Sequence, residues 1–186
     1  MLNVEKIIFE KHEHFIKQTY RNRALIYGAN GLHQLVIPVR HQQRYQVPIH
    51  EVLIANETPW QKIHWRSITS AYRKSPYFEF FESELEAFYH SPFEKLFDFN
   101  LGLTKKIFSL LKLPFNAEFT SSYEEHIHEV SDMRDAFLSD NRQSLPVYNQ
   151  VFADRHGFIS DLSIVDLIFN KGMESKNYLA GMVSAK

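Results

Sequence analysis

The sequence contains no cysteine, which excludes disulfide bonds, zinc–thiolate sites and a catalytic thiol. Only 6 glycines and 7 prolines occur among 186 residues, so collagen-like and low-complexity classes are excluded as well. No apolar run reaches the roughly 18 residues that a membrane-spanning helix needs, and no signal-peptide pattern opens the chain. The 21 Lys and Arg nearly balance the 22 Asp and Glu, and this balance argues against a strongly basic nucleic-acid-binding protein. We therefore expect a cytoplasmic protein without a membrane span.

The remaining composition is that of an ordinary folded domain, with 44% hydrophobic and 23% charged residues. Its length fits one domain, residues 1–186, and neither a repeat nor a linker divides it. Aromatic residues make up 15% of the chain and there are 10 histidines, so we expect a cleft with planar and titratable groups.

The first third of the chain predicts β-structure. Residues 6–10 and 51–55 are short β-branched runs typical of strands. Between them, residues 23–40 predict a hairpin with arms 24–27 and 32–39. Its turn, residues 28–31, contains Asn-Gly, which supplies the positive φ angles of a tight reversal.

The middle third predicts helices near residues 59–73, 76–89 and 92–112. Thr58-Pro59-Trp60-Gln61 and Ser91-Pro92-Phe93-Glu94 both have the form of a capping box, which marks a helix start. In the last third, residues 117–120 predict a strand. Ser160-Asp161 predicts the cap of a helix over 162–170 that Gly172 ends, and a small helix is expected after residue 175. The predicted class is α+β: a small, mainly antiparallel sheet from the N-terminal third packs against a C-terminal set of helices.

Two histidine pairs have a spacing that can present both rings on one face of extended backbone: His12 with His14, and His126 with His128. Neutral imidazole is a common metal ligand. The alternative, surface or edge-strand histidines, is favoured, so no metal and no cofactor is predicted.

A dense polar run precedes the predicted hairpin. Arg21 and Arg23 share a face if the strand begins there, and guanidinium groups bind phosphate or carboxylate bidentately. With Lys17 nearby, the run predicts an anion site. The alternative is a solvated strand face.

The first predicted helix carries both tryptophans of the chain, and His64 lies one turn after Trp60. If His64 lies at the margin between core and solvent, its surroundings would shift its pKa and make the imidazole suitable for proton transfer. The structural alternative is a buried histidine that is hydrogen-bonded to backbone.

The helix predicted over 162–170 carries Asp166 between apolar neighbours, where a carboxylate costs free energy unless it is paired. Arg23, Arg66 or His64 are the expected partners. No nucleotide-binding glycine loop and no nucleophile-elbow motif is present.

Several blocks together resemble the WbqC-like protein family, in the order found in that family. They are Lys17-Gln18-Thr19-Tyr20-Arg21-Asn22-Arg23, Trp60–Ile68 with Tyr72, Pro76-Tyr77-Phe78, Phe99-Asn100-Leu101 and Leu162–Gly172. The resemblance implies a setting in O-antigen or other surface-glycan biosynthesis, with a sugar nucleotide or similar anionic small molecule as ligand. It also implies an acyl- or aminoacyl-type transfer to an activated amino sugar. This chain resembles a short form of the family, because it lacks the N-terminal His-Gln-Pro-x-Tyr-Leu-Pro-like segment, and because residues 121–145 contain no glycine-rich loop.

Two functions remain open at this point. The first is a transferase, with His64 and Asp166 as catalytic residues and a substrate-binding set of Lys17, Tyr20, Arg21, Asn22, Arg23, Trp60, Arg66 and Asn170. The second is an accessory protein that binds the same anionic ligand without making a bond. Both require that the basic run, the tryptophan-bearing helix and the Asp166 helix meet at one hollow.

Overall fold

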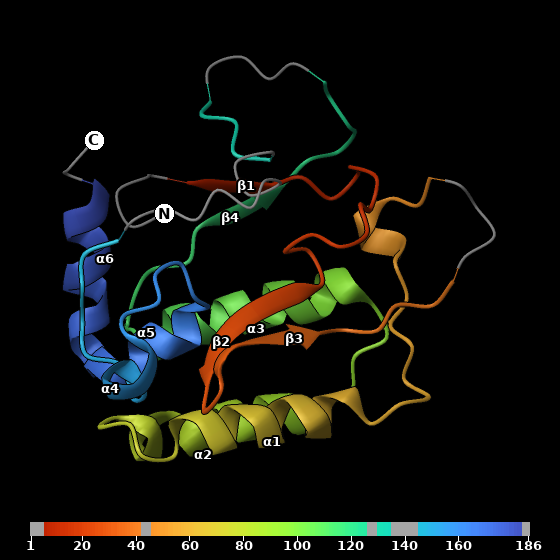
Figure 1. The fold of residues 1–186 in the computed structure, drawn as a ribbon. Helices are drawn as coiled ribbons and strands as arrows, with labels where there is room; N and C mark the ends of the chain where they lie inside the picture. The colour runs from red at the N-terminus through yellow and green to blue at the C-terminus, as the bar shows by residue number, and fades with distance from the viewer. Residues whose placement is uncertain (1–5, 42–45, 126–129, 135–144, 184–186) are drawn as a thin grey trace.

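The computed structural model describes residues 6–41, 46–125, 130–134 and 145–183, and the statements below concern those residues. Figure 1 shows a mixed α+β fold, which confirms the predicted class. Its strands are β1 (Ile7–Phe9), β2 (Arg23–Gly28), β3 (Gly31–Val36) and β4 (Ala117–Phe119). Its helices are α1 (Trp60–Tyr72), α2 (Phe78–His90), α3 (Leu96–Leu110), α4 (Ala153–His156), α5 (Ile164–Lys171) and α6 (Ser175–Val183), with 3-10 turns at Ile49–Glu51 and Gly172–Glu174.

The strands form two separate pairs rather than the single, mainly antiparallel sheet that the sequence predicted. β2 and β3 make the antiparallel hairpin, whereas β1 pairs in parallel with β4 in the register Ile7↔Ala117. The Thr120 hydroxyl donates to Glu10 Oε1 (2.9 Å) and so fixes the end of the parallel pair. Polar irregular chain lies between β1 and β2, which lets β1 leave the hairpin and join β4.

The hairpin turn is a two-residue loop, because Gly28 pairs with Gly31. Within this turn, φ is positive at Gly31 (95°) but not at Asn30, so the positive φ angles expected for the Asn-Gly pair are found for its glycine alone. A glycine at this position avoids the steric cost that a side chain has in the left-handed region.

The three expected helix starts differ in detail from the structure. Pro59 takes the N-cap position of α1, and no side chain caps that helix. Ser91 ends α2, where its hydroxyl donates to the carbonyl of Ala87 (3.1 Å), and α3 begins only at Leu96. At α5 the N-cap is Ser163, again without a side-chain bond.

The predicted strand over 51–55 is also absent, because its backbone groups bond to several different segments. Arg40 N donates to the Leu53 carbonyl (2.9 Å), and Ile54 N donates to the Glu94 carbonyl (2.8 Å). These contacts leave isolated bridges at Leu53 and Ile54 instead of a continuous ladder. They also hold residue 94 in place ahead of α3, which explains the late start of that helix.

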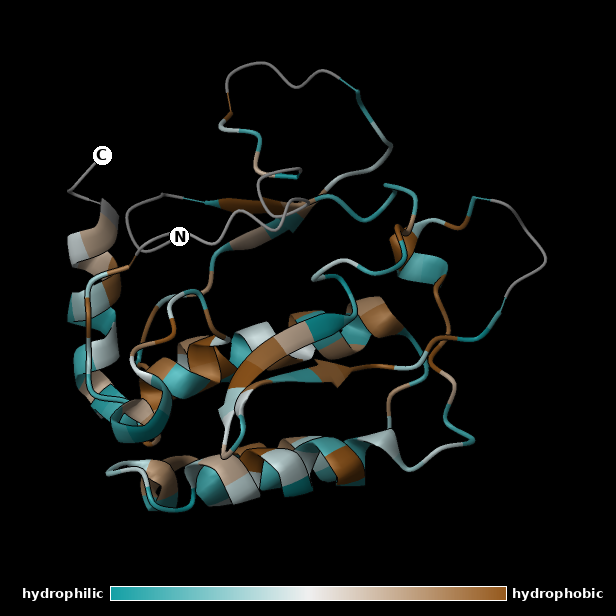
Figure 2. Ribbon diagram, in the orientation of Figure 1, coloured by the Kyte–Doolittle hydropathy of each residue, from teal (hydrophilic) through white to brown (hydrophobic). Residues whose placement is uncertain are grey.

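The core combines aromatic and aliphatic side chains and lies where α1, α2, α3 and α5 meet the hairpin (Figures 1 and 2). The Trp60 ring packs edge-on against Phe99, with ring centroids 5.0 Å apart, and Tyr72 packs against Phe169 at 5.2 Å. The Tyr72 hydroxyl accepts a hydrogen bond from Tyr27 N (2.9 Å) and so ties α1 to β2. No helix of the described residues has both the length and the apolar character needed to cross a bilayer.

Gly172 ends α5 with a φ of 57° and is buried against an aromatic ring. A Cβ at this position would lie 2.5 Å from Cδ1 of Tyr77. The glycine therefore permits both the backbone turn and the close approach of α5 to the start of α2, as the sequence predicted for the helix end.

Candidate functional site

A cavity of about 400 Å³ lies between the start of β2 and the loop that leads into α5. Its lining is formed by Tyr20, Arg21, Arg23, Ala24, Leu25, Asp161, Leu162 and Ser163. Ser163 N donates to the Leu25 carbonyl (2.7 Å), which holds the 161–163 loop beside β2. The loop bends at Asp161, whose φ is 56°. Two segments more than a hundred residues apart in the chain thus form one hollow.

The two arginines of this lining have different partners. Arg21 Nε donates to Glu13 Oε1 (2.9 Å), and its guanidinium also bonds to Glu13 Oε2, so this arginine already has a carboxylate. Arg23 has no ion pair with any described residue, and its Nε is buried without a hydrogen-bond partner. A buried donor without a partner costs about 1–3 kcal/mol, and an anionic ligand in the cavity can relieve that cost.

The rest of the lining supplies groups suited to polar ligands. Ser163 precedes the first turn of α5, and its hydroxyl does not cap the helix, so it is available to a ligand. The N-terminus of a helix favours negative charge. Asp161 adds a carboxylate that accepts hydrogen bonds from hydroxyl groups. The cavity therefore combines one uncommitted cation with acceptors for neutral hydroxyls.

Asp166 lies one turn beyond this cavity and is completely buried. Its Oδ2 accepts hydrogen bonds from the Tyr148 hydroxyl (2.6 Å) and from Gln150 Nε2 (3.0 Å). Its Oδ1 is buried without a hydrogen-bond partner, and the Tyr72 hydroxyl also influences the carboxyl group. Burial is the largest influence and raises the pKa of Asp166 above its ordinary value, while Tyr148, Tyr72 and Gln150 oppose the rise. Among the residues that the structure describes, no arginine or histidine pairs with Asp166, contrary to the partners expected from the sequence.

His64 is also buried, and its Nε2–H donates to the Val36 carbonyl (2.9 Å). Its ring packs edge-on against Trp60, with centroids 5.1 Å apart. Burial lowers the pKa of His64, which the backbone bond partly offsets, and His33 lowers it further. Its position matches the structural alternative considered from the sequence, and it does not line the Arg23 cavity.

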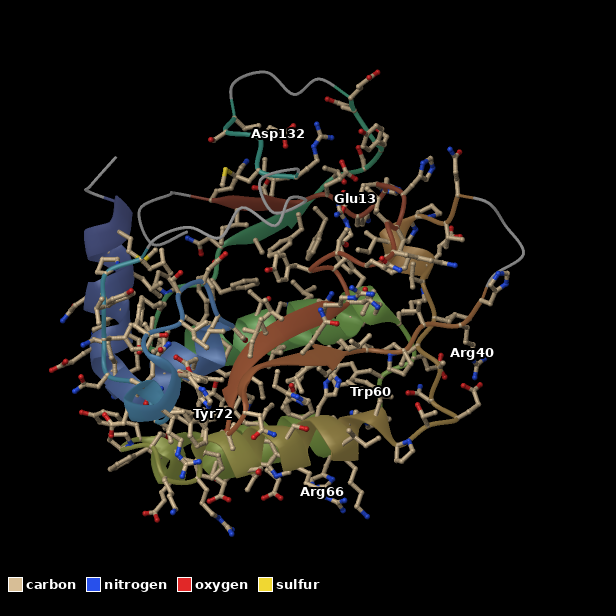
Figure 3. All side chains as sticks on the ribbon, viewed as in Figure 1. Glu13, Arg40, Trp60, Arg66, Tyr72 and Asp132 are labelled. Atoms are coloured by element: carbon tan, nitrogen blue, oxygen red, sulfur yellow. The ribbon has the colours of Figure 1, made fainter. Side chains whose placement is uncertain are left out.

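The other residues predicted for the site lie in several places. Asn22 is buried and donates to the Ile37 carbonyl (3.0 Å), and Asn170 donates to the backbone carbonyl of Asp166 (2.7 Å). Trp60 and Tyr72 lie on the hairpin side of α1, whereas Arg66 extends from the opposite side into solvent (Figure 3). Lys17 is exposed and lies outside the cavity lining.

The expected meeting of three segments at one hollow is thus found for two of them. The basic run and the loop before α5 form the Arg23 cavity, while α1 lines a different cavity. α1 reaches the Asp166 helix through the ring of Tyr72, which packs against Phe169 of α5.

Among residues 6–41, 46–125, 130–134 and 145–183, no group of three His, Asp or Glu side chains could hold a metal ion. His12 packs edge-on against His50, with ring centroids 4.9 Å apart, while His14 is exposed. His126 and His128 lie outside the described residues. Sequence reasoning missed Asp161 in the cavity lining. The only signal for it was the tolerance of aspartate for positive φ.

The fold and cavity define an α+β protein with an arginine-lined hollow between a hairpin and a late helix. The model of the WbqC-like protein family matches residues 1–140, and the chain belongs to that family. The match ends before α5, so it includes the Arg23 side of the cavity but not the Ser163 side. The chain is also 25% identical over 209 aligned positions to the uncharacterized protein Rv1507c of Mycobacterium tuberculosis, covering 95% of this chain and 88% of the relative. No solved structure matches the chain.

Proposed function

We propose that this protein is a transferase of surface-glycan biosynthesis that passes an acyl or aminoacyl group to an activated amino sugar, such as a sugar nucleotide. Membership of the WbqC-like family supports the setting. The observation that carries the ligand class is Arg23, whose buried Nε has no partner at the edge of a cavity of about 400 Å³. Cavities of a few hundred Å³ are typical of small-molecule sites.

In this proposal the phosphate of the ligand binds Arg23, since a guanidinium fork fits phosphate oxygens bidentately. The sugar hydroxyls bind Asp161 and Ser163, which supply a carboxylate and a hydroxyl on the opposite wall. Arg21 contributes no new anion contact, because Glu13 already occupies its guanidinium. Arg23 is therefore the residue on which affinity for the phosphate depends.

The bond-forming step joins the amino nitrogen of the sugar to the carbonyl carbon of an acyl thioester. As the C–N bond forms, the C–S bond breaks, the thiolate leaves, and the amine gives up one proton to a base. His64 and Asp166 stay the predicted proton-transfer residues. Because both are buried outside the cavity lining, their part in the reaction requires a direct test.

The test of ligand binding compares thermal unfolding with and without UDP-N-acetylglucosamine. A ligand at 100 times its Kd adds about 2.7 kcal/mol to the free energy of unfolding, which raises Tm by about 5–10 °C in a chain of this size. We expect this shift in the parent protein and in Arg40→Gln, because Arg40 is an exposed arginine paired with Glu57. The shift should be absent in Arg23→Gln. An equal Tm shift in Arg23→Gln would show that the ligand does not bind in the Arg23 cavity.

The second candidate function is an accessory protein that binds the same ligand without transfer. The placement of His64 favours it, because the Nε2–H of that ring is bonded to the Val36 carbonyl and the ring is outside the cavity. Mass spectrometry of UDP-glucosamine incubated with acetyl-coenzyme A and the protein separates the two functions. A gain of one acetyl mass supports the transferase. Unchanged sugar nucleotide together with an Arg23-dependent Tm shift supports the accessory protein.

A further inference from the structure

A second cavity, of about 610 Å³, lies along the outer groove between α1 and α2. One wall is the C-terminal half of α1 and the turn after it, and the other wall is α2. Ala29 of the hairpin turn and the Val151–Phe152 segment close the end of the groove. Its lining shares no residue with the Arg23 cavity, so it is a separate site.

Opposite charges line the two walls of this groove. Arg66, Arg73 and Lys74 come from α1 and the turn that follows it, while Glu82 and Glu86 come from α2, one helical turn apart. Within the described residues, none of the three cations forms an ion pair. Oε1 of Glu86 accepts a hydrogen bond from the Trp65 indole Nε1–H (2.9 Å) and lies 3.8 Å from His90 Nε2, one turn later in α2.

Such separated charges are unusual on a surface where flexible side chains can meet. Arg66, Arg73 and Lys74 are exposed and have long side chains, yet no carboxylate of α2 binds them. The lining also includes Thr69, whose hydroxyl is buried without a hydrogen-bond partner. The groove therefore offers uncommitted cations from α1, and from α2 the carboxylate of Glu82 and the second oxygen of Glu86, with Trp65 and Phe152 also in its lining.

We propose that this groove is a second binding site, for a small zwitterion that carries a phosphate and an ammonium group, such as an amino-sugar phosphate. The phosphate binds the α1 wall, because three cations suit a group with a charge of about −1.5 to −2 better than a single carboxylate. The ammonium group binds Glu82 and Glu86. The groove has one positive charge in excess, and the ligand has about one negative charge in excess, so the two are complementary. Trp65 and Phe152 supply the apolar surface against which a sugar ring packs.

Isothermal titration calorimetry with three related probes tests this inference. Glucosamine 1-phosphate carries both charges, N-acetylglucosamine 1-phosphate lacks the ammonium group, and glucosamine lacks the phosphate. Charge-assisted hydrogen bonds contribute enough that loss of either group should weaken binding by about tenfold or more. Equal affinity of the two phosphates, or no saturable binding of glucosamine 1-phosphate, would overturn the proposal.

Variants then locate the binding. Glu82→Gln should weaken binding of glucosamine 1-phosphate by about tenfold and leave the N-acetyl probe unchanged, whereas Arg73→Gln should weaken both. Lys62→Gln on α1 and Glu79→Gln on α2 are matched controls, because both residues are exposed and lie outside the lining. If Glu82→Gln and Arg73→Gln bind like these controls, the groove is not the site.

Binding in the groove does not depend on the proposed function. The variant Arg23→Gln distinguishes failure of the groove site from failure of the proposed function. Binding of glucosamine 1-phosphate should be unchanged in Arg23→Gln, since Arg23 does not line the groove. Loss of that binding in Arg23→Gln would assign the probe to the other cavity and overturn this inference alone. Loss of the UDP-N-acetylglucosamine shift in every protein, with groove binding retained, would overturn the proposed function alone.

Discussion

Replacing Asp166 by asparagine should change how the stability of the protein depends on pH. The side chain is fully buried, its Oδ2 accepts hydrogen bonds from the neutral groups of Tyr148 and Gln150, and its Oδ1 has no partner. Asparagine has nearly the same shape and can still accept the bond from Tyr148, but it cannot ionise. The substitution therefore removes the cost of a buried charge and keeps most of the packing.

The sign of the effect follows from the raised pKa of Asp166. Between the ordinary aspartate value of 3.8 and the higher value in the folded protein, the unfolded chain is ionised at this position while the folded protein keeps the proton. Stability from this group is thus fully present below pH 3.8 and is lost as pH rises through the folded pKa. One such group changes the free energy of unfolding by about 1.4 kcal/mol per pH unit within this window.

Equilibrium unfolding in urea at a series of pH values measures this dependence. The free energy of unfolding of Asp166→Asn minus that of the parent should rise with pH in the window, with a slope approaching about 1.4 kcal/mol per unit, and level off above it. Asp154→Asn, at an exposed position in α4, is the control for loss of a surface carboxyl group. A flat difference for Asp166→Asn, or one that falls as pH rises, would refute the reasoning, because it would mean that the neighbouring donors keep the buried carboxylate ionised.

Three further outcomes are expected. Tyr72→Phe leaves the amide N–H of Tyr27 buried without its acceptor and should lower the free energy of unfolding by about 1–3 kcal/mol in urea titrations. A decrease in the free energy of unfolding of less than ~0.5 kcal/mol would mean that water or another group replaces the hydroxyl as acceptor. Gly172→Ala should lower the free energy of unfolding by at least about 1–3 kcal/mol, because this glycine has a positive φ and an aromatic ring lies against it. Gly181→Ala, in open space within α6, should instead raise the free energy of unfolding by about 0.5–1 kcal/mol. Equal effects of the two substitutions would contradict the close contact at position 172. The imidazole of His64, with its lowered pKa, should stay neutral in NMR titrations as pH falls through 6.5, and a midpoint at or above that value would refute its burial.

The parts of the fold that local sequence signals specify were predicted closely. Pro59 marks the start of α1, Gly31 the hairpin turn and Gly172 the end of α5, and each acts through the backbone of its own residue. The second capping box failed because Ser91 instead bonds to α2, and because Ile54, nearly forty residues earlier in the chain, binds the segment that the predicted helix would have used. Short-range patterns do not contain such long-range competition.

In the candidate site, too, local sequence signals were informative and long-range contacts were not predicted. Spacing alone indicated that Arg21 and Arg23 could bind an anion, but it could not separate them. The difference arises from Glu13, which folds back onto Arg21 and leaves Arg23 without a carboxylate. For Asp166 the sequence indicated a need for partners, and the partners expected were cations. The actual neutral donors, such as Tyr148, come from a loop whose position no periodicity describes.

The parallel pairing of β1 with β4 has a consequence for how the chain reaches this fold. Glu10 and Thr120, which bond at the end of that pair, are 110 residues apart. A ribosome therefore releases the first strand long before its partner exists, while the hairpin and α1 can already assemble from nearby residues. We expect β1 to pair only after residue 120 has been synthesised, so it stays unpaired while the hairpin and α1 assemble, and it can join before α5 is made.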